Sequence, residues 1–325
     1  MNRWQALLAQ ALIAFALAGC TQSDPAWYVY MEEARHACAL QDEKASDQAL
    51  AQAKTDAEKS GGCPAPLADP PAAPREPRTY TGELCSLADC LAFHHKFPQA
   101  EALDKEALSL SEKNPDKTNI SSPLNALADV YEKQKKYPEA ESMLRKLVEK
   151  TTGNFDNLFA LIKCLILEGK IDEALALAKK GVEDEKELPM KSPSLTEHLN
   201  LLGYCYYDKH NFEAAEKIYS EALNYSPVSS DPERGDQFNG KDLKPLADLY
   251  LAKDDLQKAE TYYRAALSGH FERPMAERIE LLKQDALVLQ KLGKTDQWLA
   301  RKDEIKAREQ KLASDPPTYR PTIYD

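Results

Sequence analysis

Glycine is scarce in this sequence, with 12 residues among 325, about half of the roughly 7% that is usual in proteins. A low glycine content disfavours all-β folds, because the tight turns between strands need residues that accept positive φ angles. Stretches of clustered lysine and arginine are also missing, and the formal net charge is −11. Phosphate backbones are bound through such clustered cations. We therefore expect an all-α protein that does not bind nucleic acid.

Sequence motifs for catalysis and metal binding are missing as well. The chain has no Gly-x-Ser-x-Gly elbow, no Walker loop and no Gly-x-Gly-x-x-Gly fingerprint. It lacks Cys-x-x-Cys and His-Glu-x-x-His, and the spacing from Cys85 to Cys90 does not match a zinc knuckle. Most of the 6 histidines stand alone in the sequence. We therefore expect no enzymatic activity, no cofactor and no bound metal.

The first 20 residues have the order of a secretory signal. Arg3 precedes an apolar run, and the small residues Ala18 and Gly19 follow that run. A membrane-spanning helix needs about 20 apolar residues, whereas Gln5 and Gln10 interrupt this shorter stretch. An export signal that is later removed fits these residues better than a spanning helix.

The end of this stretch, Leu17-Ala18-Gly19-Cys20, resembles the lipobox of bacterial lipoproteins. The resemblance implies cleavage of a signal peptide that covers residues 1–19 and attachment of acyl chains, such as palmitate, to Cys20. Two or more acyl chains anchor a protein stably. Thr21, in place of an aspartate, implies sorting to the outer membrane, with the protein facing the periplasm.

The rest of the chain repeats one helical pattern. Small residues recur where two antiparallel helices would approach closely, and tyrosines recur where they would fill the gaps around that contact. The clearest copy runs from Leu202-Gly203-x-x-Tyr206 to Phe212-x-x-Ala215-x-x-x-Tyr219-x-x-Ala222, and Pro227 follows it. Further copies lie at 127–144 and 246–266, weaker ones at 84–107 and 158–181, and a degenerate one at 282–305.

This pattern resembles the tetratricopeptide repeat (TPR). The resemblance implies an all-α solenoid of about five to six helical hairpins over residues 83–311, including a C-terminal cap. Residues 20–60 are expected to form an N-terminal helical hairpin. Residues 61–82, with six prolines, are expected to be a semi-rigid linker. Residues 312–325 are expected to be a disordered tail.

The TPR resemblance also implies a concave groove lined by the first helix of each repeat, in which extended peptides or partner helices bind. The tyrosines among the implied positions are candidates for hot spots, because buried aromatics contribute much of the energy of many interfaces. The alternative is that they pack internally. Carried over by register, the positions are Asn125, Asp129, Phe159, Lys163, Asn200, Tyr204, Tyr207, Asp208, Lys244 and Asp248.

If Cys20 is lipidated, six cysteines remain, and an even number in an oxidising compartment suggests disulfides among 15 possible pairings. Cys38 and Cys90 hold nearly equivalent positions in the two upstream helical units, which leaves Cys63 with Cys85. Cys164 and Cys205 are either a further pair or buried free thiols.

A membrane-anchored scaffold or adaptor is the function that these features imply by resemblance. It would mediate protein–protein interactions in assembly of the cell envelope, without chemistry of its own. The alternative is a regulator that presents or activates a cell-wall or secretion enzyme. In both cases the partner is a protein or peptide of the cell envelope.

Overall fold

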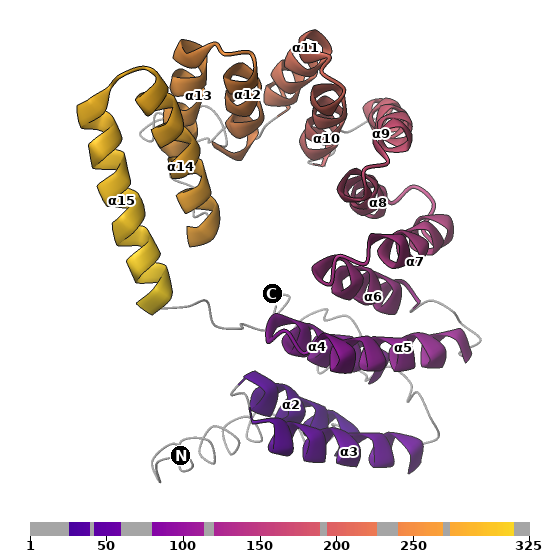
Figure 1. Cartoon of the computed structure of the whole chain (residues 1–325). Coiled ribbons are helices and arrows are strands. Elements are labelled where there is room, and N and C mark those ends of the chain that lie inside the picture. Colours follow the sequence, from indigo (N-terminus) through magenta and orange to yellow (C-terminus); the bar gives the residue numbers. More distant parts are fainter. Residues whose placement is uncertain are drawn as a thin grey trace, which may run out of the picture. The chain divides into compact units, whose positions relative to one another are not determined.

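The computed structural model describes residues 26–39, 42–59, 80–113, 120–188, 194–225, 240–268 and 274–314 (Figure 1). These residues form fourteen α-helices, and the all-α fold of TPR type is confirmed. The expected signal peptide, Cys20, Cys63, most of the linker and most of the tail lie outside the described residues. Among the described residues, no helix is both long and apolar enough to cross a membrane.

The chain divides into two compact units at residue 152. The described part of the N-terminal unit has three helical hairpins, formed by α2 (Ala26–Ala39), α3 (Glu43–Lys59), α4 (Tyr80–Phe93), α5 (Phe97–Lys113), α6 (Ser121–Lys133) and α7 (Tyr137–Lys150). The C-terminal unit has four, formed by α8 (Phe155–Glu168), α9 (Ile171–Lys186), α10 (Leu195–Asp208), α11 (Phe212–Leu223), α12 (Gly240–Ala252), α13 (Leu256–Ser268), α14 (Met275–Lys291) and α15 (Thr295–Ser314).

Two of the predicted segment boundaries need correction. Helix α4 begins at Tyr80, inside the predicted linker, and Tyr80 and Thr81 are buried at 4% and 1% exposure. The reason is that the aromatic ring joins the core formed with α2 and α5. Helix α15 extends to Ser314, three residues into the predicted tail, because the first proline after it is Pro316.

Five of the described hairpins pack around an alanine near the start of the second helix. The predicted alanine anchors are all fully buried: Ala100, Ala140, Ala174, Ala215 and Ala259. On the first helix of one hairpin, a Cβ added to Gly203 would lie 2.4 Å from the ring of the buried Tyr219. This confirms that the absence of a side chain at Gly203 lets α10 and α11 approach, with the ring of Tyr219 filling the space.

The turn inside each of six hairpins contains one residue in the left-handed region. The next amide donates back to a carbonyl five residues earlier, as from Lys96 to Leu91 at 2.8 Å, which is the Schellman ending of a helix. Glycine fills this position only twice, so the low glycine content does not reflect a lack of such turns. The six residues, with φ between 58° and 84°, are His95, Lys135, Gly169, His210, Asp254 and Gly293.

A glutamate directly after the alanine anchor connects successive hairpins in both units. Glu216 of α11 accepts from the Tyr250 hydroxyl at 2.7 Å and from Lys253 at 2.6 Å. Glu101 of α5 contacts Tyr131 and Lys136 in the same way, at 3.3 and 3.4 Å. These contacts fix the stacking of one hairpin on the next. The predicted repeat pattern contains no such contacts, although a glutamate directly after the alanine is visible in the sequence.

Candidate interaction cavity

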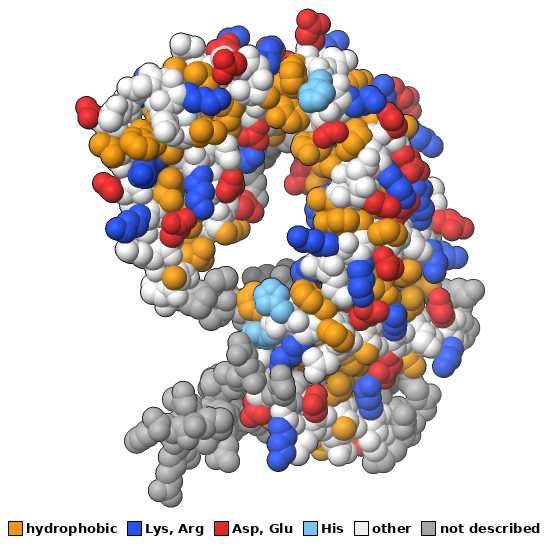
Figure 2. All heavy atoms as spheres, in the orientation of Figure 1, with side chains coloured by type: hydrophobic (Ala, Val, Ile, Leu, Met, Phe, Trp, Pro, Cys, Tyr) orange, Lys and Arg blue, Asp and Glu red, His pale blue; other side chains and the backbone are white. Residues whose placement is uncertain are grey.

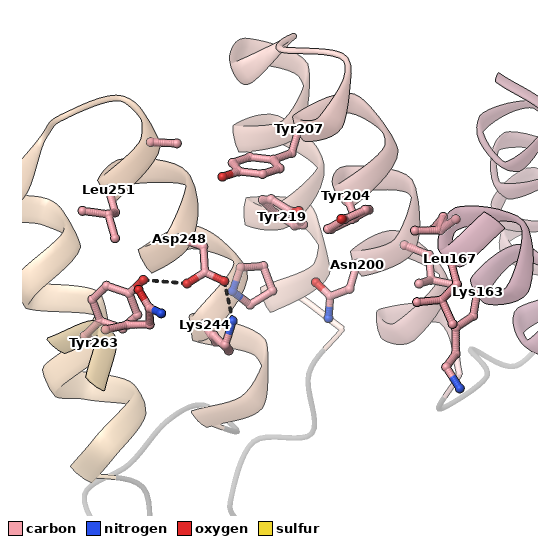
Figure 3. A pocket seen from close by; sticks show the side chains of 15 residues that line it. Lys163, Leu167, Asn200, Tyr204, Tyr207, Tyr219, Lys244, Asp248, Leu251 and Tyr263 are labelled. Carbon is pink, nitrogen blue, oxygen red and sulfur yellow. Dashed lines mark hydrogen bonds and ion pairs between the residues drawn. The ribbon is translucent and has the colours of Figure 1, made fainter. Parts of the chain in front are cut away.

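The C-terminal unit contains a cavity of about 670 Å³, lined by helices α8, α10, α11, α12, α13 and α14 (Figure 3). Its wall combines tyrosines and aliphatic side chains with two lysines and one aspartate. The lining residues are Lys163, Ile166, Leu167, Asn200, Leu201, Tyr204, Tyr207, Tyr219, Lys244, Pro245, Asp248, Leu251, Ala252, Tyr263 and Gln284.

Asp248 of α12 holds one side of the cavity together. Its carboxylate accepts a hydrogen bond from the Tyr263 hydroxyl at 2.6 Å and forms an ion pair with Lys244, one helical turn earlier (Figure 3). Burial raises the pKa of Tyr263, with Asp248 adding to the effect. The phenol therefore keeps its proton and remains a hydrogen-bond donor. These contacts fix the side chains on this wall before any partner arrives.

The opposite wall carries exposed apolar side chains. Tyr204 of α10 is 41% exposed and Leu167 of α8 is 46% exposed. The rings of Tyr204 and Tyr207 lie against each other, with their centroids 6.2 Å apart. Burial, together with nearby Asp248, raises the pKa of Tyr207. This wall thus presents aromatic and aliphatic side chains beside Lys163, and it is only partly shielded from water.

Six of the ten predicted groove residues line this cavity: Lys163, Asn200, Tyr204, Tyr207, Lys244 and Asp248. Phe159 packs edge-on against the ring of buried His198, with centroids 5.7 Å apart. Asp208 is exposed at the end of α10 and is not part of the lining. Their role in binding stays a prediction.

The other two predicted residues, Asn125 and Asp129, belong to α6 of the N-terminal unit. Asn125 is exposed, and Asp129 forms an i,i+4 ion pair with Lys133. Their role in binding stays a prediction too.

Several lining residues were not among the predicted groove positions. Tyr219 and Tyr263 were assigned to packing within hairpins, yet each also borders the cavity. Leu167 follows the predicted positions of α8 by one turn. Leu167 could have been recognised from the sequence. It lies one helical turn after Lys163, so an apolar residue shares a face with a predicted groove lysine, which breaks the amphipathic pattern.

A serine, a glutamate and a histidine lie together elsewhere in the C-terminal unit, but they do not form a catalytic triad. The Ser194 hydroxyl donates to Glu185 at 2.6 Å, not to the histidine. Nδ1 of His198 lies 3.0 Å from Glu185, and Nε2 lies 3.1 Å from the carbonyl of Phe155. Glu185 and His198 are fully buried. A nucleophile needs a base within reach and access to substrate, so this network connects helices α8, α9 and α10.

The cysteines fall into separate groups. Cys38 and Cys90 are buried, and the Cys90 thiol donates to Cys38; this contact, with Lys96 nearby, lowers the pKa of Cys38. Cys85 lies elsewhere, beside Asp104, and burial raises its pKa. Cys164 and Cys205 are both fully buried, and whether they pair stays open. The Cys38–Cys90 and Cys63–Cys85 disulfides stay predictions, the second because Cys63 is outside the described residues.

Comparison with known proteins agrees with the repeat pattern. Three sequence profiles of the tetratricopeptide repeat match residues 80–150, 131–189, and 198–229 with 246–268. Tetratricopeptide repeat protein 21B of Xenopus laevis is 28% identical over 163 residues, which are 44% of this chain and 12% of that protein. The chain therefore matches only a small part of the length of that relative.

Two solved structures show the same fold. The structure of BtubC (BKLC) from P. vanneervenii has a TM-score of 0.55 at 19% identity, covering 72% of this chain and 97% of that one. The apo form of the quorum sensor NprR from B. thuringiensis has a TM-score of 0.54 at 14% identity, covering 86% of this chain and 75% of that one. Such similarity concerns the fold alone. TPR proteins bind protein or peptide partners. Because the TPR profiles match repeats in both units, this chain belongs to the tetratricopeptide repeat family and is a protein–protein interaction scaffold.

Proposed function

We propose that the cavity of the C-terminal unit binds a segment of a partner protein, and that acyl chains on Cys20 attach the scaffold to the outer membrane, facing the periplasm. There it would bring proteins together during assembly of the cell envelope. The observation that carries the proposal is the cavity itself, with exposed Tyr204 and Leu167 at its edge.

The size and lining of the cavity suit a few side chains of a partner. Ligand-binding pockets typically have volumes of roughly 300–1,000 Å³, with mostly apolar walls and few polar groups. This cavity, of about 670 Å³, falls within that range. Tyrosines that become fully desolvated contribute disproportionately to binding energy. Covering the exposed parts of Tyr204 and Leu167 would remove apolar surface from water, at about 25 cal/mol for each Å².

The charges around the cavity indicate what the partner segment carries. Lys163 and Lys244 line the cavity on different helices, against the single carboxylate of Asp248. That carboxylate already accepts from Tyr263 and pairs with Lys244. A segment with an aromatic or aliphatic side chain and a neighbouring aspartate or glutamate would therefore match both the apolar wall and the excess positive charge.

The membrane anchor rests on the sequence, because Cys20 and the residues before it lie outside the described part. The support is the order of Arg3, the apolar run and Leu17-Ala18-Gly19-Cys20. Cells supplied with a radiolabelled or alkyne-labelled fatty acid should label the wild-type chain, and Cys20→Ser should remove that label. Equal labelling of the two chains would contradict the anchor but leave the cavity proposal unaffected.

Site-specific photo-crosslinking in the cell tests the cavity. A photoreactive amino acid at Tyr204 or at Tyr207 should give a discrete adduct with a partner protein. The control position is Lys217, which is exposed on α11 and is not part of the cavity lining. The same adducts from Lys217, or only diffuse background from all three positions, would show that the cavity does not bind a partner segment.

A matched pair of substitutions separates the cavity from general surface effects. Leu167→Glu places a carboxylate at the cavity edge, whereas Leu299→Glu places one on α15 at a residue of similar exposure, 48% against 46%. With the photoreactive residue kept at Tyr204, Leu167→Glu should reduce the adduct at least about tenfold, which corresponds to about 1.4 kcal/mol of binding energy. Leu299→Glu should leave it unchanged, and equal losses would count against the cavity.

A further inference from the structure

Three side chains that can bind metal meet where α2 contacts α4 in the N-terminal unit. The sulfurs of Cys38 and Cys90 and one ring nitrogen of His94 all lie within 4.8 Å of one another. Both cysteines are buried, at 3% and 0% exposure, whereas His94 is half-buried. Within the described ranges, this is the one group of three such residues with so close a spacing.

The backbone holds two of these side chains in a fixed relation. His94 follows α4 directly, and its amide donates to the carbonyl of Cys90 at 3.2 Å. The helical spacing therefore continues through the turn, and side chains four residues apart lie on the same face. Cys38, in the last turn of α2, completes the group from the neighbouring helix.

We infer that Cys38, Cys90 and His94 bind a thiophilic d¹⁰ cation, either Zn²⁺ or Cu⁺. Two thiolates and one imidazole are ligands that both ions accept. Three protein ligands leave one position for water in a tetrahedral zinc site. They also provide a thiolate-rich site of the kind that selects Cu⁺.

The charges fit a site of this composition. Loss of both thiol protons gives the ligand set a charge of −2, which Zn²⁺ neutralises and Cu⁺ reduces to −1. Lys96 and Arg35 lie close enough to Cys90 to interact with it electrostatically. These two cations would compensate the thiolates, and in particular the charge that remains with Cu⁺.

The ion would connect parts of the chain that are far apart in sequence. Cys38 and Cys90 are 52 positions apart, and α2 is otherwise attached to α4 through apolar packing and the ion pair of Arg35 with Glu83 at 3.1 Å. A metal that closes so long a loop constrains the unfolded chain strongly. The ion would thus attach the N-terminal hairpin to the first repeat.

The competing use of the same thiols is a disulfide. Its formation would pass two protons and two electrons, that is two hydrogen atoms, to an external oxidant, and it would not involve His94. The two possibilities differ in mass and in their dependence on His94, so they can be distinguished in the intact protein.

The test uses the full chain, purified in detergent and reduced. Co²⁺, as a probe of the zinc site, should bind one ion per chain and give thiolate-to-metal charge-transfer absorption. Cu⁺ should be bound in competition with a chromogenic chelator, and comparison of the two affinities identifies the preferred ion. His94→Asn should weaken binding of the preferred ion by at least about 100-fold. Loss of a residue that only supports a ligand typically weakens metal binding by roughly 10–100-fold, so a larger loss would identify His94 as a ligand.

The adjacent histidine provides a matched control. His95 is exposed and has a φ of 59°, a conformation that asparagine also accepts, so His95→Asn should keep wild-type affinity. Cys90→Ser should abolish binding, whereas Cys164→Ser, at an equally buried cysteine, should not. Equal binding by His94→Asn and wild type would overturn the inference. The inference would also be overturned if the protein isolated from cells carried no metal and contained a Cys38–Cys90 disulfide, which would make the chain two hydrogens lighter.

Discussion

The two units differ at one position in the first helix of their hairpins, the residue directly after the small or apolar residue that packs against the second helix. In the N-terminal unit, Asp89 and Asp129 occupy this position in successive repeats. In the C-terminal unit the residues are Lys163, Tyr204 and Asp248, and all three line the cavity. The residues directly before them are all small or apolar, since they must fit against a second helix.

The surroundings of the carboxyl groups also differ between the two units. Burial and the nearby charge of Asp129 raise the pKa of Asp89 to about 6. The fully buried Asp104 is affected more strongly, and burial together with Asp89 raises its pKa to about 8. In the C-terminal unit, Asp248 is compensated by Lys244 and Tyr263. The repeat thus keeps its packing, while the residue after the packing position determines the chemistry of each unit.

On the visible face, charges of both signs are interspersed over the described residues (Figure 2).

The largest expected effect comes from Asp104→Asn. In the folded chain this carboxyl keeps its proton to about pH 8, whereas an unperturbed aspartate loses it near 3.8. Because the pKa of Asp104 is higher in the folded chain than in the unfolded chain, the stability that its protonated carboxyl contributes is present below pH 3.8. This stability is lost as the pH rises to about 8. The loss is up to about 1.4 kcal/mol for each pH unit. The asparagine variant should therefore be more stable than wild type at pH 8.

Denaturant unfolding at several pH values between 4 and 8 measures this difference, with hydrogen exchange of α4 and α5 to locate it. Asp248→Asn is the comparison, because this aspartate has partners that stabilise its charge. It should lower stability at neutral pH. An unchanged pH dependence in Asp104→Asn would show that Asp104 is not the group responsible.

Gly203→Ala should have the next largest effect. The added methyl group would lie 2.4 Å from the ring of Tyr219, and overpacking of this kind costs about 1–3 kcal/mol. Alanine in a helix would otherwise be favoured over glycine by about 1 kcal/mol. Thermal unfolding should show a net loss. The double variant Gly203→Ala with Tyr219→Leu reproduces the Ala128 and Leu144 pair of the N-terminal unit and should recover part of that loss. No recovery would mean that the ring is not the obstacle.

Most of the fold could be predicted from the sequence because the packing residues recur. Ala215 and Tyr219 are recognisable by their spacing, and the structure buries both. The left-handed turn residues could not be predicted in the same way. His95, Lys135, His210 and Asp254 occupy a conformation that usually signals glycine, and the helix endings impose it on them.

The candidate site was predictable only in part, for a geometric reason. Register identifies the residues of the first helices, such as Asn200 and Tyr204, but not how far a ring from a second helix reaches. Tyr263 therefore looked like a packing residue alone. Equivalent positions in the two upstream helical units brought Cys38 and Cys90 together in the prediction, but they did not indicate His94, which follows α4 in the turn.

Tyr263→Phe should have a smaller effect than Gly203→Ala. It removes one hydrogen bond to Asp248 without creating a cavity, and a bond of this kind contributes about 0.5–1.5 kcal/mol. The carboxylate keeps its ion pair with Lys244, so the lower half of this range is expected. Chemical denaturation of the two chains at neutral pH measures the difference. A loss much above that range would indicate that Asp248 depends on Tyr263 more than on Lys244.

The smallest effect is expected where the contacts between hairpins are exposed. Lys294 forms an ion pair with the buried Glu260 at 2.6 Å, and Lys209 forms one with Asp172, which is 88% exposed. Lys294→Met should cost about 0.5 kcal/mol, because the carboxylate is held away from water and keeps Arg264 as a charged partner. Lys209→Met should not change the thermal midpoint measurably, since water and salt screen its ion pair. If both variants lost the same stability, burial of the acidic partner would not determine how strongly these contacts hold successive hairpins together.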